Sequence, residues 1–284
     1  MVAVGMIGLG DMGAPMLARL LAAGYRVSAH DVDPARSHSA ADAGARTVES
    51  PAEVAADSDV VISLVMSQDI PAAHFGEQGV LAGLRPDTVL VVGSTTTPEM
   101  VRQIRQRAGE DALLVDAPIV GGVRYAREGT VTFLAGGSAE AVDRVEPVLS
   151  ALGTVERVGP YGSGAAYKLI TNAFVMAAEA GLREALDLTD ILGGDYATAL
   201  RLFGLGPMAA VTARALDSSN PRPLRASAQD FDTLLSVVDD AASLPISAAG
   251  RDRLWAAVNA APGFEPQFVD LTRRTTARSP YRAD

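Results

Sequence analysis

Short apolar runs alternate with amphipathic segments in the first half of the chain. Residues 2–8 are apolar and end in glycine, which is typical of a buried strand. Residues 12–23 favour a helix that ends at Gly24. Further strands are expected at 26–31, 60–65, 88–93, 113–118 and 131–136, and helices at about 50–57, 97–108 and 138–151. This alternation predicts a mostly parallel sheet with helices on both faces.

The pattern changes after about residue 162. A long helix is expected at 164–192, and further helices at 195–204, 208–217, 228–244 and 245–261. We therefore predict an α/β domain at 1–162 and an all-helical domain at 163–284. The tail at 272–284 is basic and polar, and we expect it to be exposed or partly disordered.

Composition excludes several classes of function. The 284 residues are 48% hydrophobic and carry a formal net charge of -10, which argues against a phosphate-neutralising surface for nucleic acid. No cysteine is present, so disulfides, thiolate metal sites and cysteine nucleophiles are excluded. The N-terminus does not resemble a signal peptide, and no apolar run approaches the roughly 20 residues that span a bilayer. A cytoplasmic protein without a membrane or nucleic-acid partner is expected.

The stretch "GLGDMG" at 8–13 fits G-x-G-x-x-G directly after a predicted strand, at the start of a predicted helix. Gly8 would allow the tight turn, Gly10 the approach of a pyrophosphate and Gly13 close packing of helix on strand. The alternative is an ordinary glycine-rich turn. Asp31 ends the second strand, where a carboxylate binds the ribose hydroxyls of NAD, unless it only forms the turn in "DVDP". NAD is favoured, and NADP is possible because Arg36 lies nearby.

Three more stretches carry candidate chemistry. "GSTTTP" at 93–98 and "DAPIVGG" at 116–122 each follow a predicted strand, where ligands bind in open α/β sheets. "GPYGSGAAYKLITN" at 159–172 fits G-x-x-G-x-G-x-x-x-K-x-x-x-N. Lys168 and Asn172 are four residues apart and share a helix face. The alternative is an amphipathic helix with one exposed lysine, but no other charge occurs from 165 to 178.

These motifs together resemble the β-hydroxyacid dehydrogenase family, which includes 3-hydroxyisobutyrate dehydrogenases and tartronate semialdehyde reductases and is related to 6-phosphogluconate dehydrogenase. The resemblance covers nearly the whole chain. "GLGDMGAPM" at 8–16, "STTTP" at 94–98 and "DAPIVGG" look like the family's cofactor and substrate signatures, in the family's order. It implies a Rossmann-type nucleotide-binding domain at 1–162 and an all-α 6-phosphogluconate-dehydrogenase-like domain at 163–284, for substrate binding and oligomerisation.

The resemblance also implies an NAD(P)-dependent oxidoreductase that moves a hydride between a nicotinamide and a 3-hydroxyacid or its aldehyde or keto counterpart. Lys168 would be the general acid/base, which works best with a pKa lowered toward the working pH, and Asn172 its partner. A homodimer or homotetramer is implied. The cofactor-binding residues would be Gly8, Leu9, Gly10, Asp11, Met12, Gly13, Asp31, Val65, Met66, Thr95 and Gln229. The substrate-binding residues would be Val120, Gly121, Gly122, Lys168 and Asn172.

Two positions depart from the family pattern. Val120 stands where the family's substrate signature has serine, and Gln229 stands where it has lysine before Asp230. Both lost groups recognise anions, so we hypothesise a bulkier, less anionic or differently placed substrate. Arg124 follows the glycine pair and could replace the lost charge.

Two other functions remain open. Imine reductases share the fold and cofactor signature but carry aspartate or tyrosine where this chain has Lys168. A catalytically weak, cofactor-binding interaction protein would fit the changes at Val120 and Gln229. His30, expected in a strand, His38, expected in a helix or loop, and His74, expected in a loop, belong to no catalytic pair and are predicted to be structural or superficial. No residue spacing suggests a metal site.

Overall fold

The computed structural model describes residues 2–260, 263 and 265–271. Its contacts divide the chain into two compact units, Met1–Leu169 and Ile170–Asp284. The division falls within one long helix, α9 (Ser163–Ile191), whereas the boundary predicted from the sequence lies at residue 162. The predicted tail at 272–284 lies outside the described residues.

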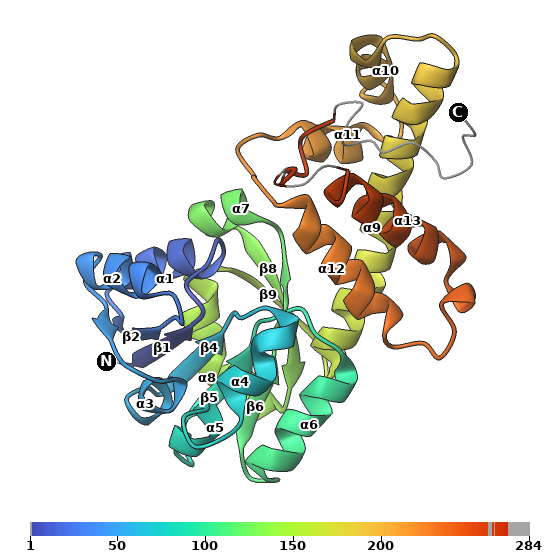
Figure 1. Ribbon diagram of the computed structural model, residues 1–284. Coiled ribbons are helices and arrows are strands. Elements are labelled where there is room, and N and C mark those ends of the chain that lie inside the picture. The colour runs from blue at the N-terminus through green and yellow to red at the C-terminus, as the bar shows by residue number, and fades with distance from the viewer. Residues whose placement is uncertain (1, 261–262, 264, 272–284) are drawn as a thin grey trace. The chain divides into compact units, whose positions relative to one another are not determined.

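The first unit is built on a twisted sheet whose strands run in the order β3-β2-β1-β4-β5-β6-β8-β7, with β9 also paired to β8 (Figure 1). The pairings from β3 to β6 are all parallel, and β8 runs antiparallel to β6 and β7. The strands are β1 (Ala3–Ile7), β2 (Arg26–His30), β3 (Arg46–Thr47), β4 (Val60–Ser63), β5 (Val89–Val92), β6 (Leu113–Asp116), β7 (Ile119–Val120), β8 (Val131–Gly137) and β9 (Gly153–Gly159).

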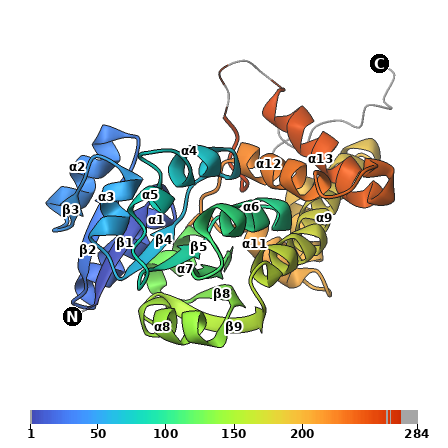
Figure 2. The same ribbon diagram turned by 90° about the horizontal axis from the view of Figure 1, so that it is seen from below.

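Alternating side chains of the central strands feed two hydrophobic cores, one on each face of the sheet. Val89 and Val91 of β5 join the core under α1, α2, α7 and α8, while Leu90 and Val92 join the core under α3, α4, α5 and α6. Figure 2 shows helices on both faces. The helices are α1 (Gly13–Ala22), α2 (Pro34–Asp42), α3 (Pro51–Ala56), α4 (Ile70–His74), α5 (Val80–Gly83), α6 (Pro98–Ala108), α7 (Val123–Glu128) and α8 (Ala139–Ser150), with a 3-10 turn η1 (Ser67–Asp69).

The sequence did not predict three of the strands, β3, β7 and β9. β3 and β7 have two residues each, too few for an alternating pattern to be recognised. β9 has the sequence GTVERVG, whose side chains are mostly exposed or half-buried and include Glu156 and Arg157. Its pairing with β8 along most of its length makes it a strand, so this element depends on a distant part of the chain.

The second unit is helical and holds the rest of α9, followed by α10 (Tyr196–Phe203), α11 (Ala209–Leu216), α12 (Leu224–Leu235), η2 (Ala241–Ser243) and α13 (Pro245–Val258). The helix expected at 228–244 is wrong at both ends. α12 begins four residues earlier, directly after Pro223, and stops at Leu235, after which Asp240 caps the short η2 turn. The core of this unit is centred on Leu186, Phe231 and Leu254.

The helical unit also buries charge along α9. Glu179, Arg183 and Asp187 follow at four-residue spacing and are all buried. Glu179 pairs with Arg214 at 2.6 Å and Asp187 with Arg253 at 2.6 Å. These pairs explain how a helix with a buried face can carry charges: each buried charge has a partner. Among the described residues, no helix is both long and apolar enough to cross a bilayer.

Candidate active site

The glycine loop has the geometry that its motif predicts. Gly8 takes a φ of +89°, and a Cβ atom there would lie 2.6 Å from the carbonyl oxygen of Leu64. A Cβ atom on Gly13 would lie 2.0 Å from the carbonyl oxygen of Gly8, so only glycine lets α1 pack this close to β1. A Cβ atom on Gly10 would meet only the Arg36 side chain, at 3.6 Å. The space beside Gly10 is therefore the open side of the loop.

Asp31 joins the glycine loop to the end of β2. Its carboxylate accepts hydrogen bonds from the backbone N–H of Leu9 at 2.7 Å and of Asp33 at 2.8 Å. Arg36 lies 3.7 Å from the same carboxylate and is half exposed. Asp31 thus holds the glycine loop in place in addition to making the predicted contact with ribose, and a half-exposed cation lies beside it.

The residues of this unit fit NAD. α1 begins without a side-chain cap, and the N-terminus of a helix favours an anion such as a pyrophosphate. Four predicted contacts follow the carboxyl ends of neighbouring parallel strands: Asp31 after β2, Gly8 after β1, Val65 after β4 and Thr95 after β5. Ligands of open α/β sheets bind at this edge. The individual contacts of Leu9, Asp11, Met12, Met66 and Gln229 with the cofactor stay predictions.

The substrate signature follows the next strand, β6, at the same edge of the sheet. Val120 is 40% exposed, and Gly121 takes a φ of +133° that favours glycine. Arg124 lies in α7, where it stacks over Tyr125 and approaches Glu128 at 3.8 Å. Its charge is therefore engaged within α7. At this position the exposed side chain of Val120 is apolar, where the family pattern has the hydroxyl of serine.

Lys168 is half-buried on α9, in the same unit as the sheet. It is also the only lysine of the chain: the other 23 basic residues are arginines. Arginine cannot lose its proton in a protein, whereas lysine can. The composition of the chain alone therefore singles out Lys168 as a side chain that can exchange a proton.

Asn172 follows Lys168 by one turn of α9 and is buried. Its Nδ2 atom has no hydrogen-bond partner among the described residues. A buried amide donor of this kind is normally satisfied, so Asn172 is available for a ligand. Asn172 and Gln229 belong to the helical unit, and their predicted roles are not tested by this geometry.

Asp116 is the first residue of the substrate signature, and the sequence predicts no role for it. It ends β6, is 1% exposed and accepts hydrogen bonds from the backbone N–H of Gly162 and Ala165, each at 2.7 Å. Burial raises the pKa of Asp116 to about 6, against the lowering effect of these donors. No local pattern could have shown this contact, because the partners are 46 and 49 residues away.

Comparison with known proteins decides the family. The model of the NAD-binding domain of 6-phosphogluconate dehydrogenase matches residues 3–162. A probable 3-hydroxyisobutyrate dehydrogenase-like protein of Arabidopsis thaliana is 36% identical over 71% of this chain and 72% of its own length. The L-threonate dehydrogenase of Cupriavidus necator is 33% identical over 86% and 95%. The chain belongs to the β-hydroxyacid dehydrogenase family. It is an NAD-dependent oxidoreductase that acts on CH–OH groups.

Solved structures agree with the two-domain fold of this dehydrogenase. A 3-hydroxyisobutyrate dehydrogenase of Mycobacterium tuberculosis, described with L-serine, matches with a TM-score of 0.77 at 24% identity, over 95% of this chain and 98% of that one. An imine reductase of Myxococcus stipitatus matches at 21% identity with a TM-score of 0.59, over 96% of this chain and 99% of that one. At such identities the likeness shows the fold alone, which both classes share.

The histidines of the dehydrogenase lie outside the motifs that carry its chemistry. His30 lies in β2, with Nδ1 3.0 Å from the carbonyl oxygen of Val48, and His38 lies exposed on α2. The loop position expected for His74 is wrong: it ends α4, fully buried, with Nε2 2.9 Å from Ser63 Oγ. Burial lowers the pKa of His74 to about 4, so it is neutral at pH 7. Within the described part of the chain, no cluster of three or more histidine, aspartate or glutamate residues could hold a metal ion.

Proposed function

We propose that Lys168 is the general acid/base of this dehydrogenase. In oxidation, the neutral amine of Lys168 takes the proton of the substrate hydroxyl, and the hydrogen on the same carbon leaves as hydride. NAD, when bound, supplies the hydride acceptor. In reduction, the ammonium of Lys168 returns the proton to the carbonyl oxygen. The observation that carries the proposal is that the single lysine of the chain occupies the predicted position in α9.

The fold supports this role. Asp116 ties the start of α9 to the end of β6, and the substrate signature begins at that same residue. Lys168 lies one turn beyond Ala165, so its helix starts at the sheet edge where ligands bind. We propose that Asn172, on the same helix face, donates its unpaired Nδ2 group to the substrate. Gly121 and Gly122 would offer backbone N–H groups to a carboxylate.

Two substitutions of Lys168 test the mechanism. Lys168→Ala removes the amine, and Lys168→Arg keeps the positive charge but cannot exchange a proton. Both variants should lose turnover by at least about a hundredfold while NAD affinity, measured by calorimetry, stays within about twofold. Arg201→Ala, an exposed cation on α10, serves as a control that should leave kcat unchanged. Turnover by Lys168→Arg at the parent rate would show that only the charge is needed.

The substrate is proposed to be larger or less anionic than hydroxyisobutyrate or glycerate. Val120 exposes an apolar side chain where a hydroxyl would bind a carboxylate, and Arg124 is engaged by Glu128 and Tyr125. A screen of 3-hydroxyacids and aldehydes with NAD and NADP, followed by absorbance of the reduced cofactor, would identify it. A kcat/KM above about 10⁴ M⁻¹s⁻¹ for simple C3–C4 hydroxyacids would contradict this proposal. A cyclic imine in the same screen tests the imine reductase alternative, which the lysine disfavours.

We propose that the chain forms a homodimer or homotetramer through an exposed apolar stripe on α9. Within the helical unit the stripe consists of Ile170, Phe174, Ala178, Gly181, Ala185 and Leu188, and Leu192 continues it just beyond the end of α9. Its large members lie toward the ends and its small members at the centre, at the three- and four-residue spacing that puts them on one helix face. Exposed apolar surface of this kind marks an interaction site.

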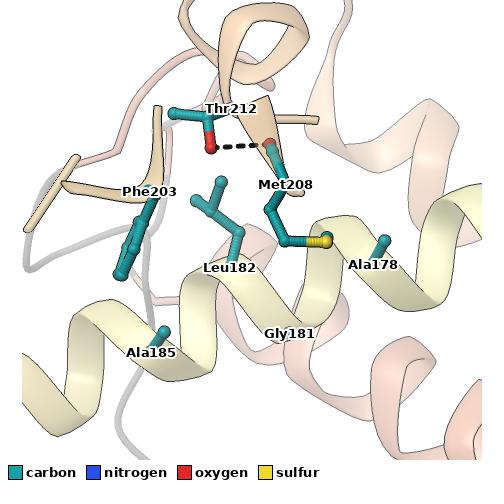
Figure 3. A pocket seen from close by; sticks show the side chains of 7 residues that line it. All are labelled: Ala178, Gly181, Leu182, Ala185, Phe203, Met208 and Thr212. Carbon is teal, nitrogen blue, oxygen red and sulfur yellow. Dashed lines mark hydrogen bonds between the residues drawn. The ribbon is translucent and has the colours of Figure 1, made fainter. Parts of the chain in front are cut away.

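A second copy of the chain is the occupant that this surface fits. Phe174 is 83% exposed. The small residues of the stripe form the floor of an apolar pocket of about 200 Å³ together with Leu182, Phe203, Met208 and Thr212 (Figure 3). A cavity of about 150 Å³ binds benzene, so this pocket can take a phenyl ring. A two-fold axis across α9 would bring the Phe174 of each copy toward the small residues of the other.

Sedimentation analysis tests this assembly. Phe174→Asp should dissociate the oligomer at micromolar concentration, because a carboxylate would enter an apolar pocket. Val32→Asp, which places the same charge on an exposed position of the other unit, should leave the mass unchanged. A parent protein that sediments as a monomer at about 50 µM would contradict the proposal. A cytoplasmic location also stays a prediction, which subcellular fractionation would test.

A further inference from the structure

The start of α9 lacks a cap of its own. The helix begins at Ser163, and the residue before it, Gly162, has no side chain that could accept a hydrogen bond. The first N–H groups of a helix have no partner within the helix and need an acceptor from elsewhere. In many helices the side chain of the cap residue, just before the first helical residue, accepts a hydrogen bond from the N–H of the third helical residue. A carboxylate or amide side chain on that third residue in turn accepts from the N–H of the cap residue.

Asp116 performs both tasks from a distant strand. Its Oδ1 atom accepts from the N–H of Gly162 and its Oδ2 atom from the N–H of Ala165, each at 2.7 Å. These are the N–H groups of the cap position and of the third helical residue. A carboxylate at this place also interacts favourably with the helix dipole. One side chain of β6 therefore replaces the complete local cap of the helix that carries Lys168.

The backbone around this carboxylate leaves no room for adjustment. A Cβ atom on Gly136 of β8 would lie 2.5 Å from Asp116 Oδ1. A Cβ atom on Gly164 would lie 2.9 Å from Asp116 Oδ2, and 2.3 Å from the carbonyl oxygen of Leu134. Both glycines are therefore required for the approach of α9 to the sheet. The carboxylate is enclosed by backbone on the sheet side and on the helix side.

We propose that Asp116 is a positioning residue that sets Lys168 relative to the substrate signature. Asp116 belongs to that signature, since "DAPIVGG" starts with it and Val120, Gly121 and Gly122 follow within six residues. Its two hydrogen bonds fix the first turn of α9, and Lys168 lies in the next turn. The inference rests on the proposed role of Lys168 in proton transfer. Asp116 is 1% exposed, so in this proposal it acts through α9 and not on the substrate.

The ionised form of Asp116 is the stronger acceptor, so the contact depends on pH. Three other titratable or charged groups lie on α6, on α9 and just before α9. The Tyr161 hydroxyl is buried, and burial followed by the charge of Asp116 raises the pKa of Tyr161 far above its usual range, so it stays neutral. The Arg105 guanidinium lies 5.0 Å above the Tyr161 ring, and Lys168 lies one turn along α9. With a pKa of about 6, Asp116 changes charge between about pH 5 and 7.

Asp116→Asn tests the inference. The amide oxygen can accept from only one of the two backbone N–H groups, and the amide NH2 group, itself a donor, faces the other. We expect kcat to fall at least tenfold while KM for NAD changes less than twofold. Hydrogen exchange of the protein without cofactor should become at least tenfold faster for the amides of Gly162 and Ala165. Asp143→Asn, an exposed carboxylate of α8, is the matched control and should change neither value. Unchanged kcat and unchanged exchange in Asp116→Asn would overturn the inference.

The pH profile separates positioning from a purely structural role. In the reduction direction Lys168 works from its protonated form, so it contributes no loss on the acid side. The parent should lose kcat as pH falls through about 6, and Asp116→Asn should lack this limb. If Asp116→Asn does not fold, the pH dependence of amide exchange at Gly162 and Ala165 in the parent tests the inference instead. Protection factors of these amides that stay constant from pH 7.5 to 5 would refute the proposal that ionised Asp116 holds the start of α9. If Lys168→Arg stays active, the function proposal fails, while the exchange data still report on Asp116.

Discussion

Acidification should destabilise the first unit through His74. The ring is fully buried in α4, and its Nε2 atom lies 2.9 Å from Ser63 Oγ. Its Nδ1 atom has no partner among the described residues, so a second proton would be buried without an acceptor. The pKa of His74 is about 4 in the fold against 6.5 in the unfolded chain. The folded state therefore binds fewer protons, and stability is fully present above pH 6.5 and falls as pH drops toward 4.

The size of the effect follows from the two pKa values. Their difference corresponds to about 3 kcal/mol once both states are fully protonated. Between pH 7.5 and 5 the loss from His74 is about 2 kcal/mol. Asp116 acts in the opposite sense: its raised pKa makes its contribution largest at low pH and lost as pH rises through about 6. Over the same interval acidification returns about 1 kcal/mol through Asp116, so the parent curve alone hides both effects.

A comparison of variants isolates the histidine. Urea unfolding followed by circular dichroism at pH 7.5 and 5 would be measured for the parent, His74→Gln and His38→Gln. The free energy of the parent relative to His74→Gln should fall by about 2 kcal/mol on acidification, because glutamine does not titrate. For the exposed His38, the free energy of unfolding of the parent relative to His38→Gln should change by less than about 0.5 kcal/mol on acidification. A parent and His74→Gln that share one pH dependence would refute the reasoning.

Three further substitutions give distinct outcomes. Gly10→Ala should lose NAD affinity at least tenfold by calorimetry, because its Cβ would stand where the pyrophosphate approaches, but it should keep its stability, because that Cβ meets only the Arg36 side chain. Gly13→Ala should also lower the melting temperature, because its Cβ would lie 2.0 Å from the backbone of Gly8. Arg36→Ala should raise KM for NADP more than KM for NAD in steady-state assays, because it removes the cation beside the expected ribose contact. Glu179→Gln should lower the free energy of unfolding in urea by about 3 kcal/mol, because it removes the buried carboxylate that pairs with the charge of Arg214. A decrease below about 1 kcal/mol would contradict this.

Local patterns determined much of this protein. Short continuous apolar runs predicted six of the nine strands that the structure describes, because each lies in a sheet covered on both faces. The glycine motif predicted its own geometry: Gly13 meets the backbone of Gly8 within one βα turn, whereas Gly8 is held against the distant backbone of Leu64. The family followed from motifs in order, and the comparisons confirmed it. The lone lysine is likewise a fact of composition that needs no coordinates.

Only the tertiary structure decided which distant groups meet. Asp116 caps α9 from 46 residues away, and the sequence records this only as glycines that leave room for the approach. β9 is a strand because β8 lies beside it, and His74 is buried because α4 packs on the sheet. In each case the decisive energy comes from a long-range pairing or from the exclusion of water. Hydrophobic periodicity reports which face of an element is buried, but not which residue it is buried against.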